Sequence, residues 1–181
     1  HQPDRGFTFQ LGSGASLAAR CRIDTVSDFR TFDVALGGQG APLVPVGDEL
    51  LFDSYRFCLN LGGFANISNR YDRLRIACDI CPVNIVANHL AQRKGQEFDR
   101  NGIMGSHGKI VPELGEELND LEYYARPAPQ SLGREWVETS FMPVMNKYDL
   151  EPGDMLRNAY EHMAIQISRY INGHEAGEVL V

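Results

Sequence analysis

The sequence lacks any long cluster of Lys or Arg, and 24 acidic against 17 basic residues give a formal charge of −7. A chain with this balance has no electrostatic footprint for nucleic acid or for an anionic membrane surface. It also lacks an apolar run near the roughly 18 residues of a membrane-spanning helix, and no signal-peptide pattern precedes the first expected strand. We therefore expect neither nucleic acid nor a membrane as a partner, and a cytoplasmic location.

Cysteine is scarce, with four residues in the chain: Cys21, Cys58, Cys78 and Cys81. Cys78 and Cys81 form a C-x-x-C pair, which is compatible with a metal or redox site. A zinc site needs two further ligands at comparable spacing, and the sequence has no second C-x-x-C and no H-x-x-x-H. The pattern favours plain reduced thiols and no metal site.

Repeats and low-complexity tracts are also absent. The 181 residues are 43% hydrophobic and 23% charged, which is typical of a globular protein. Residues 28–45 are the most unusual segment, because they combine two carboxylates, an arginine and a glutamine with several glycines and prolines and leave almost no helix-forming run. Such a segment is either a crossing loop or a backbone that approaches a ligand closely.

Residues 28–45 closely resemble the signature D-F-R-x-x-D-[VI]-A-x-G-G-Q-G-A-P-L-V-P of the anhydro-N-acetylmuramic acid kinases. Three further segments are similar to motifs of the same family, in the same order. Residues 6–12 resemble its G-x-T-x-Q-I-G strand, residues 59–66 its L-N-I-G-G-I-A-N segment, and residues 129–136 its P-K-S-x-G-R-E-[WYF] segment.

Two features depart from the family pattern. Members are longer and carry a G-T-S-x-D-G-x-D phosphate loop and a G-G-G-x-x-N nucleotide segment, which do not occur here, so we expect an internal piece of a longer protein. Where the family has D-T-G-P-[GA]-N, residues 79–84 place Cys81 and Val83 at two small-residue positions. A β-branched valine in a phosphate-binding turn argues for a changed or lost phosphate contact.

Turn residues and hydrophobic periodicity predict the elements. We expect strands at 6–11, 22–26, 56–60, 65–69, 74–79 and 178–181, the last of them buried. We expect helices at 14–20 and 46–53, after Pro82, and at 97–105, 110–121, 133–146 and 152–172. The last helix begins with a proline and carries a core-facing stripe of Leu156, Ala159, Met163, Ile167 and Ile171.

This pattern alone indicates an α/β protein with a mixed sheet. The resemblance implies a ribonuclease-H-like fold of the actin/hexokinase-like ATPases, present as an incomplete two-lobed kinase. Residues 1–53 would be the end of the first lobe with the glycine-rich loop. Residues 54–181 would be the second lobe, a βββαβ core with a helical insertion, ending before the adenosine-binding turn.

The resemblance also implies candidate site residues. The catalytic aspartate of the family's D-T-G-P-x-N motif corresponds to Asp79, at the end of a strand, where it would take a proton from water. The alternative is that Asp79 only caps the following helix. Asn84 would orient Asp79, contact substrate, or cap that helix.

The glycine-rich segment supplies the remaining candidate sugar ligands: Arg30, Asp28 and Gln39. Arg30 suits the lactyl carboxylate of a muramic acid derivative, although an ion pair with Asp28 or Asp33 that braces the loop is an equal alternative.

Gly62 and Gly63 are the candidate cofactor-binding residues, as a phosphate-facing turn after a strand. The Arg134–Glu135 segment is expected to pin its loop through an intramolecular salt bridge.

The implied function is ATP- and Mg²⁺-dependent ring opening and 6-O-phosphorylation of 1,6-anhydro-N-acetylmuramic acid, from recycled cell wall, by the parent protein. This chain alone is expected to be inactive. Two alternatives remain open: a non-catalytic sugar-binding sensor, and an ATPase of the same superfamily that acts on another sugar or acid. The partners predicted are a small sugar and, through apolar surface that a missing half would cover, a second copy in a homodimer.

Overall fold

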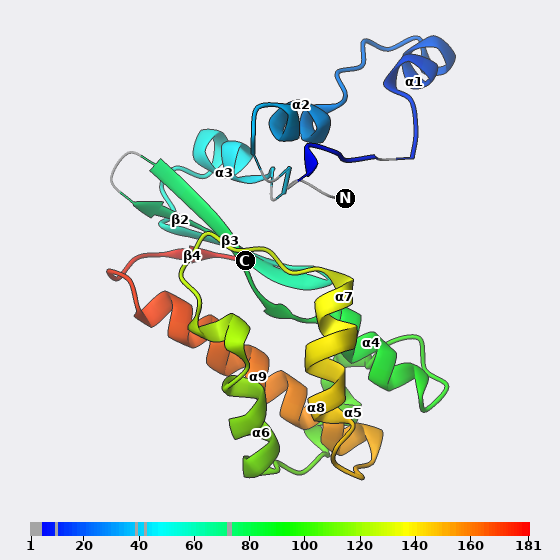
Figure 1. Ribbon diagram of the computed structural model, residues 1–181, viewed down its shortest axis with the longest axis vertical. Coiled ribbons are helices and arrows are strands. Elements are labelled where there is room, and N and C mark those ends of the chain that lie inside the picture. The colour runs from blue at the N-terminus through cyan, green and yellow to red at the C-terminus, as the bar shows by residue number, and fades with distance from the viewer. Residues whose placement is uncertain (1–4, 10, 39, 42, 72–73) are drawn as a thin grey trace. The chain divides into compact units, whose positions relative to one another are not determined.

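The computed structural model (Figure 1) describes residues 5–9, 11–38, 40–41, 43–71 and 74–181. The chain divides into two compact units at Val46/Gly47. Among the described residues, no helix is both long and apolar enough to cross a membrane.

The first unit contains two short helices, α1 (Gly14–Cys21) and α2 (Phe29–Ala35). The Ser13 side chain begins α1 by accepting a hydrogen bond from the Ser16 N–H, which satisfies one of the free amide groups of the first turn. Most of the large apolar side chains described in this unit are exposed, whereas Val34 is buried, at 4% exposure.

The predictions for the first unit were partly wrong. The helix at 14–20 is confirmed, but residues 22–26 form no strand, and the described part of 6–11 shows only an isolated bridge at Phe7. The glycine-rich segment is not helix-free, because Phe29–Ala35 is helical. A strand needs a paired neighbour along its length for its backbone groups, and neither run forms a ladder in the part of the chain that the structure describes.

The second unit is built on a four-stranded sheet in the order β3-β2-β1-β4. The strands β1 (Phe57–Leu61), β2 (Phe64–Tyr71) and β3 (Leu74–Pro82) form an antiparallel meander. The short β4 (Val179–Leu180) joins β1 in parallel, with Phe57 opposite Val179. The predicted mixed α/β sheet is confirmed, although Val179 is 37% exposed and β4 is not the buried strand that we expected.

Helices cover the sheet and enclose the core. The long α9 (Pro152–Asn172) packs against β3 and against α4 (Asn84–Gln92), α5 (Ile103–Ser106) and α6 (Pro112–Asn119) (Figure 1). A further helix, α3 (Pro45–Leu51), spans the division between the two units. The expected stripe on α9 is confirmed: Leu156, Ala159 and Met163 are buried, and Ile167 and Ile171 are partly buried against the core. Short 3₁₀ turns, η2 (Arg100–Gly102) and η3 (Glu122–Ala125), connect the helices, so the helix predicted at 97–105 is broken in two.

The helix predicted at 133–146 is present but irregular. It runs through α7 (Arg134–Trp136), a π-helical stretch η4 (Val137–Phe141) and α8 (Met142–Met145). Pro143 has no N–H to donate to the carbonyl four residues earlier, which accounts for the wider helical turn at this point.

Candidate functional site

Asp79 lies in β3, and its neighbours come from a segment far away in the sequence. One carboxylate oxygen, Oδ2, accepts two hydrogen bonds, from the Leu132 N–H at 2.8 Å and the Ser131 hydroxyl at 3.1 Å. The Asp79 N–H donates to the Gln130 carbonyl, and the Tyr123 hydroxyl donates to the Asp79 carbonyl at 2.7 Å. Residues 130–132 therefore hold Asp79 by both its main chain and its side chain.

The capping alternative for Asp79 does not describe this structure. The helix α4 begins at Asn84 with Val83 in the N-cap position and with no side-chain cap, and the Asp79 carboxylate is directed to the Ser131–Leu132 segment instead. Half-burial raises the pKa of Asp79, and the two donors act in the opposite direction by favouring the ionised form. A half-buried carboxylate with fixed donors has the properties of a candidate general base.

The Gly62–Gly63 turn joins β1 to β2 and holds the start of α4. The Gly63 carbonyl accepts hydrogen bonds from the N–H groups of Val83 and Ile85, and the Gly62 carbonyl accepts one from Asn84. The Asn84 side chain donates to the Leu61 carbonyl at 3.3 Å. Asn84 therefore secures the hairpin end to α4, and the turn orients its carbonyl groups towards the helix.

Neither the backbone conformation nor crowding within the chain explains the glycine at position 63. Its φ is not positive, and a Cβ built there would meet no atom within 4 Å. Gly63 lies on the wall of an open cavity, where a missing side chain lets another molecule approach the backbone.

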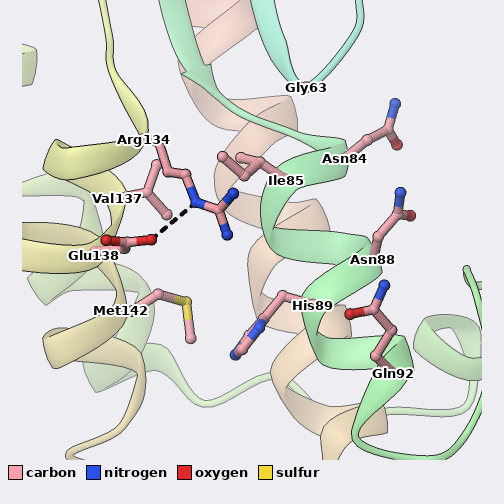
Figure 2. Close-up of a pocket in the computed structure, with 10 residues that line it drawn as sticks. All are labelled: Gly63, Asn84, Ile85, Asn88, His89, Gln92, Arg134, Val137, Glu138 and Met142. Carbon is pink, nitrogen blue, oxygen red and sulfur yellow. Dashed lines mark hydrogen bonds and ion pairs between the residues drawn. The ribbon is translucent and has the colours of Figure 1, made fainter.

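That cavity has a volume of about 530 Å³ and lies between α4 and the 134–145 helix (Figure 2). Ile85 and His89 project from α4 towards that helix, whereas Asn84 and Asn88 project from the side of α4 away from Arg134. Ten residues line the cavity: Gly63, Asn84, Ile85, Asn88, His89, Gln92, Arg134, Val137, Glu138 and Met142. The lining offers amides, a guanidinium and apolar side chains, which suits a small polar ligand with an apolar face.

Arg134 forms its salt bridge within its own helix. Its Nε donates to Glu138 Oε1 at 2.9 Å, one helical turn away. The expected pinning of the loop through the Arg134–Glu135 segment is therefore replaced by a pairing with Glu138. Both partners are exposed and line the cavity, so the pair contributes little to stability and is available to a ligand.

The charged residues of the first unit brace the glycine-rich loop through its backbone. Arg30 Nη1 donates to the Gly40 carbonyl at 2.6 Å, and the Gly40 N–H donates to Asp33 Oδ2 at 2.7 Å. Within the described residues, Arg30 forms no ion pair with Asp28 or Asp33, so the alternative of a bracing ion pair is corrected to a bracing contact with the main chain.

Backbone conformation and close packing also constrain this loop. Asp28 has a left-handed backbone at φ 69° and precedes α2 without a side-chain cap. A Cβ at Gly38 would lie 2.2 Å from Asp33 Oδ2, so the braced loop requires glycine there. Gln39, the remaining predicted sugar ligand, lies outside the described residues.

The cysteines are all free, and three of them, Cys58, Cys78 and Cys81, are buried. Burial raises the pKa of Cys78 to about 11 and that of Cys81 to about 12. No cluster of three or more potential metal ligands occurs in the part of the chain that the structure describes. Cys78 and Cys81 are free thiols that belong to the core.

Sequence reasoning missed the contacts that surround Asp79. Ser131 lies 52 residues from Asp79 in the chain, and Tyr123 lies 44 residues away. The segment 129–136 matches a family motif, but no spacing in the sequence connects it to Asp79. The spacing of Arg134 and Glu138 was readable, because residues four apart meet on one helix face.

Comparisons with known proteins match the sequence of this chain to a family. The model of the anhydro-N-acetylmuramic acid kinase family matches residues 1–181. A protein of that name from Aliivibrio fischeri is 44% identical over 142 residues, 75% of this chain and 39% of the relative. One from Neisseria meningitidis is 42% identical over 160 residues, 83% of this chain and 44% of the relative.

A third relative of that name, from Pseudomonas syringae pv. tomato, is 36% identical over 97% of this chain and 50% of its own length. The chain thus spans half the length, or less, of these curated relatives. Because the family model covers every residue, the chain belongs to the anhydro-N-acetylmuramic acid kinase family.

Proposed function

We propose that the full-length protein is a sugar kinase that acts on 1,6-anhydro-N-acetylmuramic acid, with Asp79 as general base. The main support for this proposal is the burial and hydrogen bonding of the Asp79 carboxylate. Its half-buried carboxylate has donors fixed on one oxygen only. Asp79 itself lines a smaller cavity of about 220 Å³, and the segment that holds it continues into the wall of the separate 530 Å³ cavity. The relatives, which bear the name of this activity, supply the substrate class.

In the proposed reaction Asp79 accepts the proton of the attacking water. Water loses a proton to the Asp79 carboxylate as its oxygen bonds to C1 of the sugar, and the C1–O6 bond of the anhydro ring breaks. O6 then bonds to the γ-phosphorus of ATP, and the bond between that phosphorus and ADP breaks. Because the transferred group carries most of the charge, the protein acts chiefly by positioning water, sugar and phosphate.

The residues present fit ATP as the second substrate. Gly63 lets a phosphate approach the backbone at the cavity wall, and Arg134 has guanidinium nitrogens beyond the Nε that contacts Glu138. Mg²⁺ usually keeps most of its waters and binds phosphate oxygens with one or two carboxylates, so it needs no cluster of protein ligands. When bound, Mg²⁺ would neutralise phosphate charge.

The proposal keeps the sugar ligands and cofactor contacts that the resemblance implies. The sugar ligands are Arg30, Asp28, Gln39 and Asn84, and the cofactor contacts are Gly62 and Gly63. Arg30 would need to exchange its bond to the Gly40 carbonyl for one to the lactyl carboxylate. Asn84 would contribute by holding the hairpin turn at the start of α4.

For the fold, we propose a ribonuclease-H-like second lobe at 54–181 and the end of a first lobe at 1–53. The sheet order β3-β2-β1-β4, with β4 parallel to β1, supports this assignment. On this reading the 181-residue chain alone has no kinase activity, because it lacks the phosphate loop and the adenosine-binding turn.

The test is phosphorylation of 1,6-anhydro-N-acetylmuramic acid by the full-length protein and by its Asp79→Asn variant. We expect ATP-dependent formation of a 6-phosphate and a loss of roughly 10²- to 10⁴-fold in kcat for Asp79→Asn. Asp149→Asn, at an exposed aspartate outside the cavity, is the matched control and should keep full activity. An active Asp79→Asn variant would remove Asp79 from the mechanism.

Cys81 and Val83 motivate a second candidate, a sugar-binding relative without catalysis. Cys81 is fully buried in the core opposite Ala65, and the Val83 N–H is used by the Gly63 carbonyl, so neither backbone nor side chain is arranged here as a phosphate cradle. Calorimetric titration with the sugar separates the two candidates. Binding that tightens with a non-hydrolysable ATP analogue supports the kinase, and binding indifferent to nucleotide supports the sensor.

A further inference from the structure

The two oxygens of the Asp79 carboxylate have different surroundings. Oδ2 accepts both hydrogen bonds, from the Leu132 N–H and the Ser131 hydroxyl, and Oδ1 accepts none from the residues that the structure describes. Two donors on one oxygen fix the rotation of the carboxylate. The other oxygen keeps its lone pairs for a proton.

The donors come from a segment that is itself held in place. The Gln130 carbonyl accepts the Asp79 N–H at 3.0 Å, and the Leu132 side chain is 8% exposed. The position of Leu132 N–H relative to β3 is therefore set by packing. Ser131 is exposed, and its hydroxyl is the contact with the Asp79 carboxylate that a side-chain substitution can remove.

Four ionisable groups near Asp79 are Cys78, Tyr123, Arg126 and Arg169. Burial raises the pKa of Cys78 to about 11 and also raises the pKa of Tyr123, so both are neutral at neutral pH. Arg126 and Arg169 line the same cavity as Asp79, and Arg126 is exposed and paired with Glu122. Hydrogen-bond donors, and not a cation, offset the desolvation of the Asp79 carboxylate.

We propose that Ser131 is a positioning residue for Asp79, and that it holds the carboxylate ionised and turns Oδ1 towards the attacking water. This inference rests on the proposed function of Asp79 as general base. Ser131 does not touch the reacting atoms in this scheme. It acts through Asp79, together with the Leu132 N–H, which remains when the hydroxyl is removed.

The experiment compares Ser131→Ala and Ser131→Thr in the full-length protein. Ser131→Ala removes one hydrogen bond to a charged group. We expect the apparent pKa of the acid limb of the kcat/KM–pH profile to rise by about one pH unit and kcat to fall roughly tenfold, with KM little changed. Ser131→Thr keeps the hydroxyl and should restore both. Ser106→Ala removes an exposed hydroxyl that bonds the Ile103 carbonyl and is the matched control.

A second readout does not depend on activity. The pKa of Asp79, followed by carboxyl ¹³C NMR, should rise by about one pH unit in Ser131→Ala and not in Ser106→Ala. An unchanged Asp79 pKa in Ser131→Ala would overturn the inference, even if kcat fell. Absence of phosphorylation by the unaltered protein would instead refute the proposed function, and the NMR result would still decide the role of Ser131.

Discussion

His162 on α9 provides a pH-dependence prediction whose size follows from the structure. The side chain is 1% exposed, its Nδ1 lies 2.9 Å from Asn119 Oδ1 and its Nε2 lies 2.8 Å from the Tyr124 hydroxyl. Burial, with a smaller contribution from the Arg169 charge, lowers the pKa of His162 from 6.5 to about 3. The folded state therefore favours the neutral imidazole over the charged one.

The sign of the effect follows from proton binding. The unfolded chain binds a proton at His162 below about pH 6.5, and the folded chain does not bind it until about pH 3, so stability falls as the pH drops through this window. Between pH 7 and pH 5 the free energy of unfolding should decrease by about 2 kcal/mol through His162 alone, at about 1.4 kcal/mol per pH unit. Asp79, whose pKa is raised, contributes in the opposite direction.

The assay is urea unfolding followed by the fluorescence of Trp136, the single tryptophan, which contacts Tyr124 beside His162. His162→Gln removes the titrating group, so the loss between pH 7 and pH 5 should shrink by about 2 kcal/mol relative to the unaltered protein. The Asp79 contribution is common to both proteins and cancels. His107→Gln, at an exposed position, is the control. An equal pH dependence for His162→Gln and the unaltered protein would refute this reasoning.

Two further predictions concern buried or braced polar groups. Asn158→Ala should lower the free energy of unfolding by about 2 kcal/mol in the same urea assay, because Asn158 is 1% exposed and accepts from the Val111 N–H at 2.8 Å; an effect below about 0.5 kcal/mol would contradict this account. Asp33→Ala should speed amide hydrogen exchange at Gly40 roughly tenfold, because the Gly40 N–H loses its carboxylate partner. Asp24→Ala, at an exposed aspartate, should leave that exchange rate unchanged.

Local patterns in the sequence predicted the second unit well. The three strands of the meander and the helix α9 follow from alternation, turn residues and a helical stripe, all of which are properties of neighbouring residues. Packing then buries the predicted face of α9, with Leu156 and Ala159 at 0% exposure. Where a strong local signal and burial agree, the sequence is sufficient.

The first unit was predicted less well because its local signals conflict. The glycines and prolines at 37–45 concealed the helix Phe29–Ala35 that precedes them. The apolar runs at 6–11 and 22–26 suggested strands, but strands depend on a neighbour that no local pattern supplies.

The candidate site shows the same limit, because only the motif identified Asp79. Its donors come from a segment 52 residues away, and that contact is a consequence of tertiary packing. Leu132 connects the packing of the core with the geometry of the site. Its side chain is buried, its N–H donates to Asp79, and the chain enters the helix of the cavity wall two residues later. The packing of Leu132 in the core therefore sets both the direction of the carboxylate and the start of the wall that Arg134 lines. A substitution that shifts Leu132 should disturb the site without touching a ligand, because the site is positioned from the core outwards.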